Sequence, residues 1–241
     1  MSKKVLIILS YLILVVTLAS LSYASRTSVI DTPRLEMLNC GSYNAELRFS
    51  SSKGDLISKV EFGILKSLNL GLSWEWSNFI SNKQVGIAIP ALQAKFRIYE
   101  GSMVMPGLAV GYDGQGYFFD SKSGKYLQKS KGIYFIIGRE IFSEGVMLNV
   151  GANIKLFSSS KIYGFVNAIA PLHKENIFFM MEYDNIHSFA DARFNLGLKL
   201  ILKKHLNIDC ILRDCLKNGS NCDKYRCSGE TIFRIAYSAE L

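Results

Sequence analysis

The sequence has little histidine and little proline. Its 241 residues include 3 histidines and 4 prolines. The histidines, His173, His187 and His205, fall in expected turns or loops, away from any strand that carries a candidate nucleophile. Barrel hydrolases use a histidine base beside a serine or an acid. The sequence therefore predicts a non-enzymatic protein with no catalytic residue, cofactor or metal, and a histidine-dependent hydrolase is the disfavoured alternative.

Long apolar runs are missing after residue 21, so no later segment reaches the roughly 20 residues that a membrane-spanning helix needs. The run over residues 5–21 follows Lys3 and Lys4 and ends at Ser22-Tyr23-Ala24. A basic start, an apolar centre and small residues before the expected cleavage site predict a signal peptide over residues 1–24. The alternative is an uncleaved anchor helix. In either case the rest of the chain is exported, and a mature membrane protein would have to cross with strands.

The five cysteines are an odd number, which leaves at least one thiol unpaired within an exported chain. Cys215, Cys222 and Cys227 lie close together and predict a local disulfide whose pairing the sequence does not define. A zinc site is the alternative, but no histidine lies near and the spacing is not of the C-x-x-C kind. The net charge of +8 is mild, and no basic stripe indicates a nucleic-acid partner.

Alternation of apolar and polar residues, by contrast, runs along nearly the whole chain. Leu68–Trp76 places three leucines and two tryptophans on one side of a strand, and Asn69, Gly71, Ser73 and Glu75 on the other. A membrane barrel turns such an apolar face to lipid and its polar face to the lumen. Twelve segments are predicted as strands: 44–50, 59–64, 68–76, 92–98, 107–117, 132–141, 148–155, 162–170, 177–184, 193–200, 206–213 and 233–238. Tyr134 and Ile136 blur the polar side of 132–141, and the alternation over 162–170 is ambiguous, so its faces are not assigned.

The connections between these segments are sorted by length. Short ones, at 66–67, 100–103, 143–145, 171–175 and 203–205, follow even-numbered strands, whereas the long ones, at 77–90, 118–131 and 216–229, follow odd-numbered strands. Short periplasmic turns and longer outer loops are typical of outer-membrane barrels. The sequence thus predicts an all-β chain: a periplasmic lead-in over residues 25–42 and one antiparallel transmembrane barrel of about twelve strands over 43–241. A secreted β-sandwich is the alternative.

The polar faces of these strands predict a lumen in which charges of both signs are paired. Paired charges are tolerated away from water, so we expect a largely occluded, structural barrel, with a narrow passive channel for small polar solutes as the alternative. The lumen-facing charged residues are predicted to be Arg48, Lys59, Glu61, Glu75, Lys95, Arg97, Asp113, Lys155, Glu182, Asp184, Arg193, Lys199, Asp209, Arg213 and Arg234.

Aromatic residues near the strand ends predict a girdle at the membrane interface. Its members are Trp74, Trp76, Tyr112, Tyr183 and Tyr237. The long connection over residues 118–131 is rich in lysine and aromatics, which suits either lipopolysaccharide or an ordinary solvated loop. The expected surroundings are the lipid and lipopolysaccharide of the outer membrane of a Gram-negative-type bacterium.

Five segments are distinctive in sequence: Val29–Pro33, Ile89–Arg97, Ala109–Tyr117, Met181–Asn185 and Arg193–Leu198. Together and in this order they resemble the YjbH-like outer-membrane β-barrel family. The resemblance implies an outer-membrane location and a part in surface polysaccharide export, with polysaccharide or export-system proteins as partners. Members of the family are much longer chains, so this chain looks like their barrel portion alone.

Overall fold

The computed structural model describes residues 28–102, 105–121, 123–141, 145–155, 161–173, 176–187, 192–202, 205–215 and 229–241. The predicted signal peptide lies outside these ranges. In the described part of the chain, no helix is long and apolar enough to cross a membrane.

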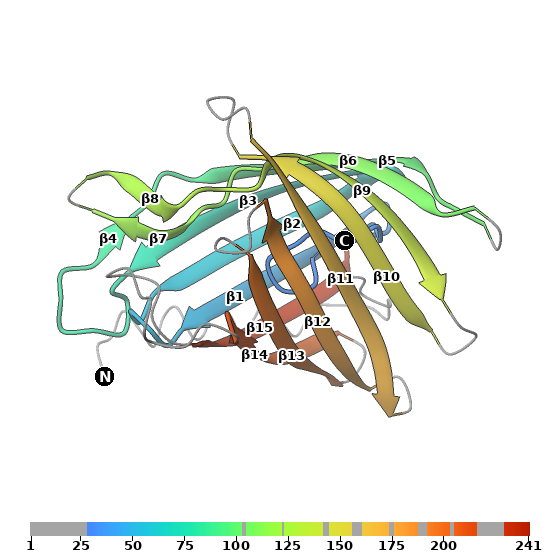
Figure 1. The fold of residues 1–241 in the computed structure, drawn as a ribbon. Coiled ribbons are helices and arrows are strands. Elements are labelled where there is room, and N and C mark those ends of the chain that lie inside the picture. The colour runs from blue at the N-terminus through green and yellow to red at the C-terminus, as the bar shows by residue number, and fades with distance from the viewer. Residues whose placement is uncertain are drawn as a thin grey trace.

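Twelve long strands form the body of the fold (Figure 1), and they match the twelve predicted segments. They are β1 (Ser42–Ser50), β2 (Leu56–Leu65), β3 (Leu68–Ser77), β5 (Ala91–Tyr99), β6 (Gly107–Asp113), β9 (Gly132–Ile141), β10 (Val146–Ile154), β11 (Ile162–His173), β12 (Ile177–Ile186), β13 (Arg193–Leu202), β14 (Leu206–Arg213) and β15 (Glu230–Glu240).

These strands close on themselves, each pairing antiparallel with its neighbour. The first strand, β1, pairs with the last, β15, from Ser42 opposite Glu240 to Ser50 opposite Ile232. On its other side β1 pairs with β2, and β2 pairs with β3. The predicted antiparallel barrel of about twelve strands is therefore confirmed, and closure leaves none of the twelve as a free sheet edge.

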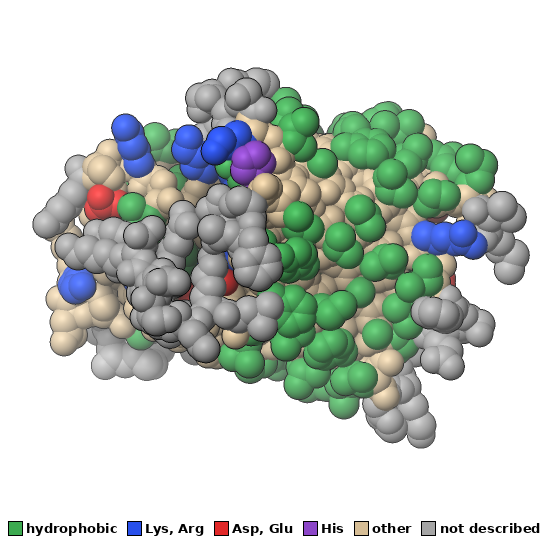
Figure 2. All heavy atoms as spheres, viewed as in Figure 1, with side chains coloured by type: hydrophobic (Ala, Val, Ile, Leu, Met, Phe, Trp, Pro, Cys, Tyr) green, Lys and Arg blue, Asp and Glu red, His purple; other side chains and the backbone are tan. Residues whose placement is uncertain are grey.

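The two faces of the barrel differ as the alternation predicts. Along β13, for example, Arg193, Asn195 and Lys199 are buried in the interior, while Leu198 and Leu200 are exposed on the outside. Figure 2 shows hydrophobic side chains spread over the side of the barrel, with the visible lysines, arginines and histidine lying toward its ends. The outward residues therefore form an apolar band of the kind that faces lipid.

Two parts of the chain differ from the prediction. The strand expected to continue to Tyr117 ends at Asp113, and the expected loop 118–131 contains a hairpin of β7 (Tyr117–Asp120) and β8 (Lys125–Gln128). A further two-residue strand, β4 (Gly86–Ile87), pairs with the end of β3. The second difference is larger. The lead-in expected to precede the barrel lies, from Ser28 onward, inside it, as the coil within the barrel in Figure 1.

Candidate functional site: a lumen filled by the N-terminal segment

Residues 28–40, here called the N-terminal segment, precede β1, and residues 28–38 of it are buried or half-buried in the lumen. Its apolar side chains pack against lumen-facing apolar residues of the wall. Val29 and Ile30 are buried in a cluster with Ile169, Met180, Ile211 and Ile232. Leu35 is buried in a second cluster with Ala109, Tyr134, Ile136 and Phe165. The segment is thus a core of the barrel rather than a polar lead-in.

The Glu182 carboxylate of β12 binds the tip of the segment, here defined as residues 29–32. Glu182 Oε2 accepts hydrogen bonds from the backbone N–H groups of Asp31 at 3.0 Å and Thr32 at 2.9 Å, and from Thr32 Oγ1 at 2.6 Å. On the wall side, Asn195 Nδ2 donates to Glu182 Oε1 at 2.8 Å. Because these donors converge on one buried carboxyl group, Glu182 is a principal anchor of the tip.

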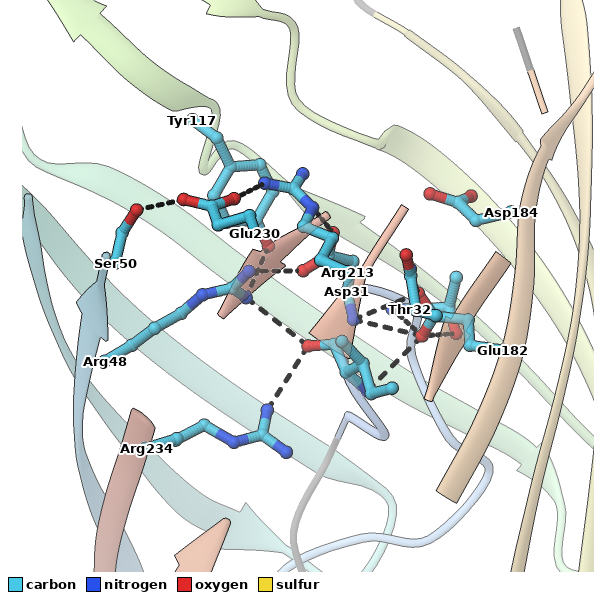
Figure 3. A network of polar contacts seen from close by, with 12 residues as sticks. Asp31, Thr32, Arg48, Ser50, Tyr117, Glu182, Asp184, Arg213, Glu230 and Arg234 are labelled. Carbon is cyan, nitrogen blue, oxygen red and sulfur yellow. Dashed lines mark hydrogen bonds and ion pairs between the residues drawn. The ribbon is translucent and has the colours of Figure 1, made fainter. Parts of the chain in front are cut away.

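The Asp31 carboxylate lies between two arginines of the wall (Figure 3). Arg48 Nη2 lies 2.7 Å from Asp31 Oδ1, and Arg213 Nε lies 2.7 Å from Asp31 Oδ2. The side chain of Asp31 is fully buried. Burial by itself would raise the pKa of Asp31, but the positive charges of Arg213 and Arg48, and of Arg193 and Lys131 farther away, outweigh it and hold that pKa well below its usual range.

The β7–β8 hairpin reaches the same two arginines. The Tyr117 ring centroid lies 4.6 Å from the Arg48 guanidinium carbon and 4.7 Å from that of Arg213, which is cation–π distance for both. Gln128 of β8 accepts a hydrogen bond from Arg213 at 2.5 Å, and Glu75 of β3 accepts one from the backbone N–H of Phe119 at 2.6 Å. The hairpin and the N-terminal segment therefore meet at one arginine pair.

Side chains from other strands hold the rest of the segment. Arg234 of β15 donates to the carbonyls of Val29 and Ile30 and pairs with Asp209 of β14. On other sides of the lumen, Lys95 of β5 donates to the Arg34 carbonyl at 3.1 Å, and Asn149 of β10 accepts from the Leu35 N–H at 3.1 Å. Wall contacts thus come from strands spread around the barrel.

Little space remains around the segment. One cavity of about 30 Å³ is lined by Ser28, Asp31 and Pro33 of the segment and by wall residues that include Lys59 and Glu61. A second, of about 10 Å³, lies beside Arg48, Tyr117 and Arg213. Cavities of this size hold about one or two water molecules, so neither of the two offers room for a larger solute beside the docked segment.

The structure buries most of the charged residues that the sequence assigns to the lumen. Arg48, Glu61, Glu75, Lys95, Glu182, Asp184, Arg193, Lys199, Asp209, Arg213 and Arg234 are buried. Lys59 and Asp113 are half-buried and line the larger cavity. Arg97 pairs with the exposed Glu100 beside the turn, and Lys155 follows the end of β10 and lies 3.9 Å from the Tyr163 ring centroid, so these two lie at opposite rims.

Important members of the site were missing from the prediction: Asp31, Thr32, Tyr117, Lys131, Asn149, Asn167 and Glu230. Lys131 falls in the loop predicted over residues 118–131, yet it pairs with Asp184 in the interior. One available signal was the blurred alternation of residues 132–141, where Tyr134 and Ile136 fall on the polar face. Both pack on Leu35, so apolar residues on a lumenal face marked the place where the segment would lie.

The predicted girdle residues are half-buried. Trp74, Trp76, Tyr112 and Tyr183 lie toward the ends of their strands that lead into the longer loops, and Tyr237 lies toward the other end of the barrel, 6.5 Å from Tyr43 between ring centroids. Their contact with lipid stays a prediction. Cys215 is an exposed free thiol, as are Cys40 and Cys210. Cys222 and Cys227 lie outside the described residues, so a disulfide between them stays a prediction.

Three buried carboxylates, of Asp31, Glu182 and Asp184, lie close enough together to suggest a metal ion. Each already has protein partners: Arg48 and Arg213 for Asp31, backbone N–H groups for Glu182, and Lys131 and Arg193 for Asp184. The group is therefore accounted for by its own donors and cations, and it serves to hold the segment.

No family model matches the chain, and no curated protein sequence matches it. Solved outer-membrane barrels are similar to it in structure. The KdgM porin, in complex with disordered oligogalacturonate, has a TM-score of 0.53 at 9% identity, covering 83% of this chain and 99% of that one. An outer-membrane channel from Pseudomonas putida F1 has a TM-score of 0.48 at 10% identity, covering 87% and 99%. The likeness to KdgM shows that the fold is an antiparallel β-barrel of the kind found in the outer membrane, and the YjbH-like resemblance stays a prediction.

Proposed function

We propose that the protein is a porin-type channel of the outer membrane that passes small polar solutes and is held closed by its own N-terminal segment. The observation that carries this proposal is that the segment contributes no strand to the barrel. Its residues 29–35 are held by wall side chains such as Arg48, Asn149 and Glu182. The segment can therefore leave the lumen without breaking a pair of strands.

The wall behind the segment supports a conduit. It carries arginines, lysines, carboxylates and asparagines that form pairs across neighbouring strands, as Arg234 does with Asp209 and Lys59 with Glu61. Once the segment leaves, such a wall remains wettable, as the interior of a porin is. The apolar band on the outside supports a membrane location.

The channel is not proposed to be an enzyme. Nδ1 of His187 contacts the Ile162 carbonyl and Nδ1 of His205 contacts the Ser238 carbonyl, so the polar contacts described for these two rings are with backbone oxygens. The part in polysaccharide export rests on the family resemblance alone, and contacts with lipopolysaccharide or export proteins remain predictions.

A reversible cross-link between the segment and the wall tests the proposal. A Cβ atom built at Gly138 of β9 lies 2.7 Å from the Leu35 Cβ. This is about 1 Å shorter than the usual Cβ separation in a disulfide, so the segment has to move away from β9 by about that distance for the bond to form. The variant is Leu35→Cys with Gly138→Cys, in a background where all five native cysteines are serine, and the matched control carries Leu35→Cys alone.

Ion current across planar lipid bilayers is then recorded before and after reduction. We expect the oxidised double variant to be silent and the reduced protein to show open events, while the control conducts equally in both conditions. Equal current from the oxidised and reduced double variant would contradict closure by the segment. Silence of every variant under all conditions would contradict the channel itself.

A further inference from the structure

The segment occupies its site in the lumen as a ligand would. Three consecutive residues supply two kinds of contact: the side chains of Val29 and Ile30 lie in an apolar cluster, and the Asp31 carboxylate lies between two arginines. Both kinds of wall residue belong to strands of the barrel and remain in place when the segment leaves. The wall therefore presents a preformed site with an apolar half and a cationic half.

The cationic half is built for a carboxylate. Arg48 and Arg213 each direct a guanidinium nitrogen at one oxygen of Asp31, both at 2.7 Å, from opposite ends of the chain. Tyr117 stacks against both guanidinium groups. Planar, delocalised guanidinium groups are well suited to binding carboxylates.

Departure of Asp31 leaves the two arginines in different situations. Arg213 keeps its pair with Glu230 at 3.1 Å, whereas the ion pair that the structure shows for Arg48 is the one with Asp31. Arg48 is 5% exposed while the segment is docked, and departure of the segment leaves its guanidinium facing the lumen without that counter-ion. An anion from solution would restore the lost pair.

The apolar half lies one residue away along the segment. Ile169, Met180, Ile211 and Ile232 point into the lumen from four strands and surround Val29 and Ile30. Met180, Ile211 and Ile232 are fully buried while the segment is present. Without it they would be exposed to water, and an apolar group of a solute would cover them again.

We infer that the open lumen binds an organic carboxylate with an apolar group beside the carboxylate, and that Val29, Ile30 and Asp31 are its built-in competitor. The inference rests on the proposed function, because a solute reaches this site only when the segment leaves. Arg48 and Arg213 take the carboxylate, and the cluster around Ile211 takes the apolar group. Such a solute would also hold the channel open, since it and the segment cannot occupy the site together.

Hexanoate binding to a variant with an empty site tests this inference. The variant is Val29→Gly, Ile30→Gly and Asp31→Gly, which removes the competitor and leaves every strand of the wall unchanged. Binding is measured by calorimetric titration of the full-length mature chain in lipid nanodiscs, with hexanoate, acetate and galacturonate as probes. A heat-dependent shift in gel mobility verifies that the strands of the variant have formed the complete barrel.

We expect hexanoate to bind the triple variant at least about tenfold more tightly than acetate does, because each buried methylene contributes about fourfold in affinity. Galacturonate, which has a polar body, is expected to bind no better than acetate. The matched control adds Arg48→Gln to the triple variant and is expected to lose at least about tenfold in hexanoate affinity. In the wild type, hexanoate is expected to bind more weakly than in the triple variant.

Equal hexanoate affinity with and without Arg48→Gln would overturn the carboxylate site. Galacturonate binding as tight as that of hexanoate would overturn its apolar half. If the triple variant does not fold, Asp31→Ala replaces it, and acetate but not acetamide must then raise its unfolding midpoint. Hexanoate binding without conductance in any variant would contradict the channel and leave the site standing, whereas conductance without hexanoate binding would contradict the site alone.

Discussion

Substituting Asp31 by asparagine is expected to open the channel. The change keeps the shape of the side chain but removes the charge that faces Arg48 and Arg213 at 2.7 Å. Removing one partner of a buried ion pair costs about 3–5 kcal/mol. Asparagine retains one acceptor oxygen, so the lower value applies. About 3 kcal/mol corresponds to a shift of more than about a hundredfold in the equilibrium between docked and released segment.

Glu36→Gln is the matched control for Asp31→Asn. It removes the same charge from the same segment, but Glu36 pairs with Arg34, which also belongs to the segment. The link between Lys95 and this part of the segment uses the Arg34 and Glu36 carbonyls, which the substitution leaves intact. We therefore expect Glu36→Gln to change the open fraction by less than about fivefold, as for a partly exposed pair.

The assay is the open fraction of single channels in planar bilayers at neutral pH, with wild type, Asp31→Asn and Glu36→Gln compared at equal insertion. Asp31→Asn is expected to be open more often by about two orders of magnitude, until the open state saturates. Two results would refute the reasoning: an unchanged open fraction for Asp31→Asn, or an equal increase for Glu36→Gln.

Three further results are expected. The pKa of Asp31 is lowered in the docked segment, so its stabilising effect is complete above the pKa of a free aspartate, about 3.9, and is lost as the pH falls toward the lower docked value. The open fraction should therefore stay constant from about pH 5 to 8 and rise only in strong acid. A rise near pH 6 would argue against Asp31 as the anchor. Gly138→Val should increase conductance, because a Cβ atom there lies 2.3 Å from Asn149 Oδ1 and 2.7 Å from the Leu35 Cβ; an unchanged single-channel record would contradict the contact. Leu198 is 51% exposed on the outer face, and Leu198→Arg should lower the free energy of unfolding from lipid vesicles by about 2–4 kcal/mol in urea titrations. A loss near zero would show that this face does not contact lipid.

The barrel was predictable because strand alternation is a local property. In β12, Met181 and Tyr183 face outward while Glu182 and Asp184 are buried, as their alternation indicates. Where a strand is irregular, the sequence predicts the strand but not its two faces. The faces of residues 162–170 could not be assigned, and β11 carries register shifts between Gly164 and Val166 and between Pro171 and His173, which disturb the period of two.

The filled lumen was not predictable in the same way. Pairing of charges within the wall was expected, but Asp31 precedes the wall, 17 residues before Arg48 and 182 before Arg213, and nothing local indicates that it would join them. Val29 and Ile30 belong to a short stretch with no strand or helix pattern. Their partners Ile211 and Ile232 fall on lumenal faces, where an apolar side chain needs a partner inside the barrel. Such mismatches between side chain and face are what sequence reasoning could use to detect an internal segment.

The closing of the barrel by β1 and β15 has a consequence for the order of assembly. Arg48 belongs to the first strand and Arg234 to the last, and both hold the same tip of the N-terminal segment. A folding intermediate without β15 in place lacks Arg234, so the contacts of the tip are incomplete until β1 and β15 have paired. Docking of the segment is therefore expected to be a late event in biogenesis, and a sealed lumen would mark a barrel whose insertion is complete.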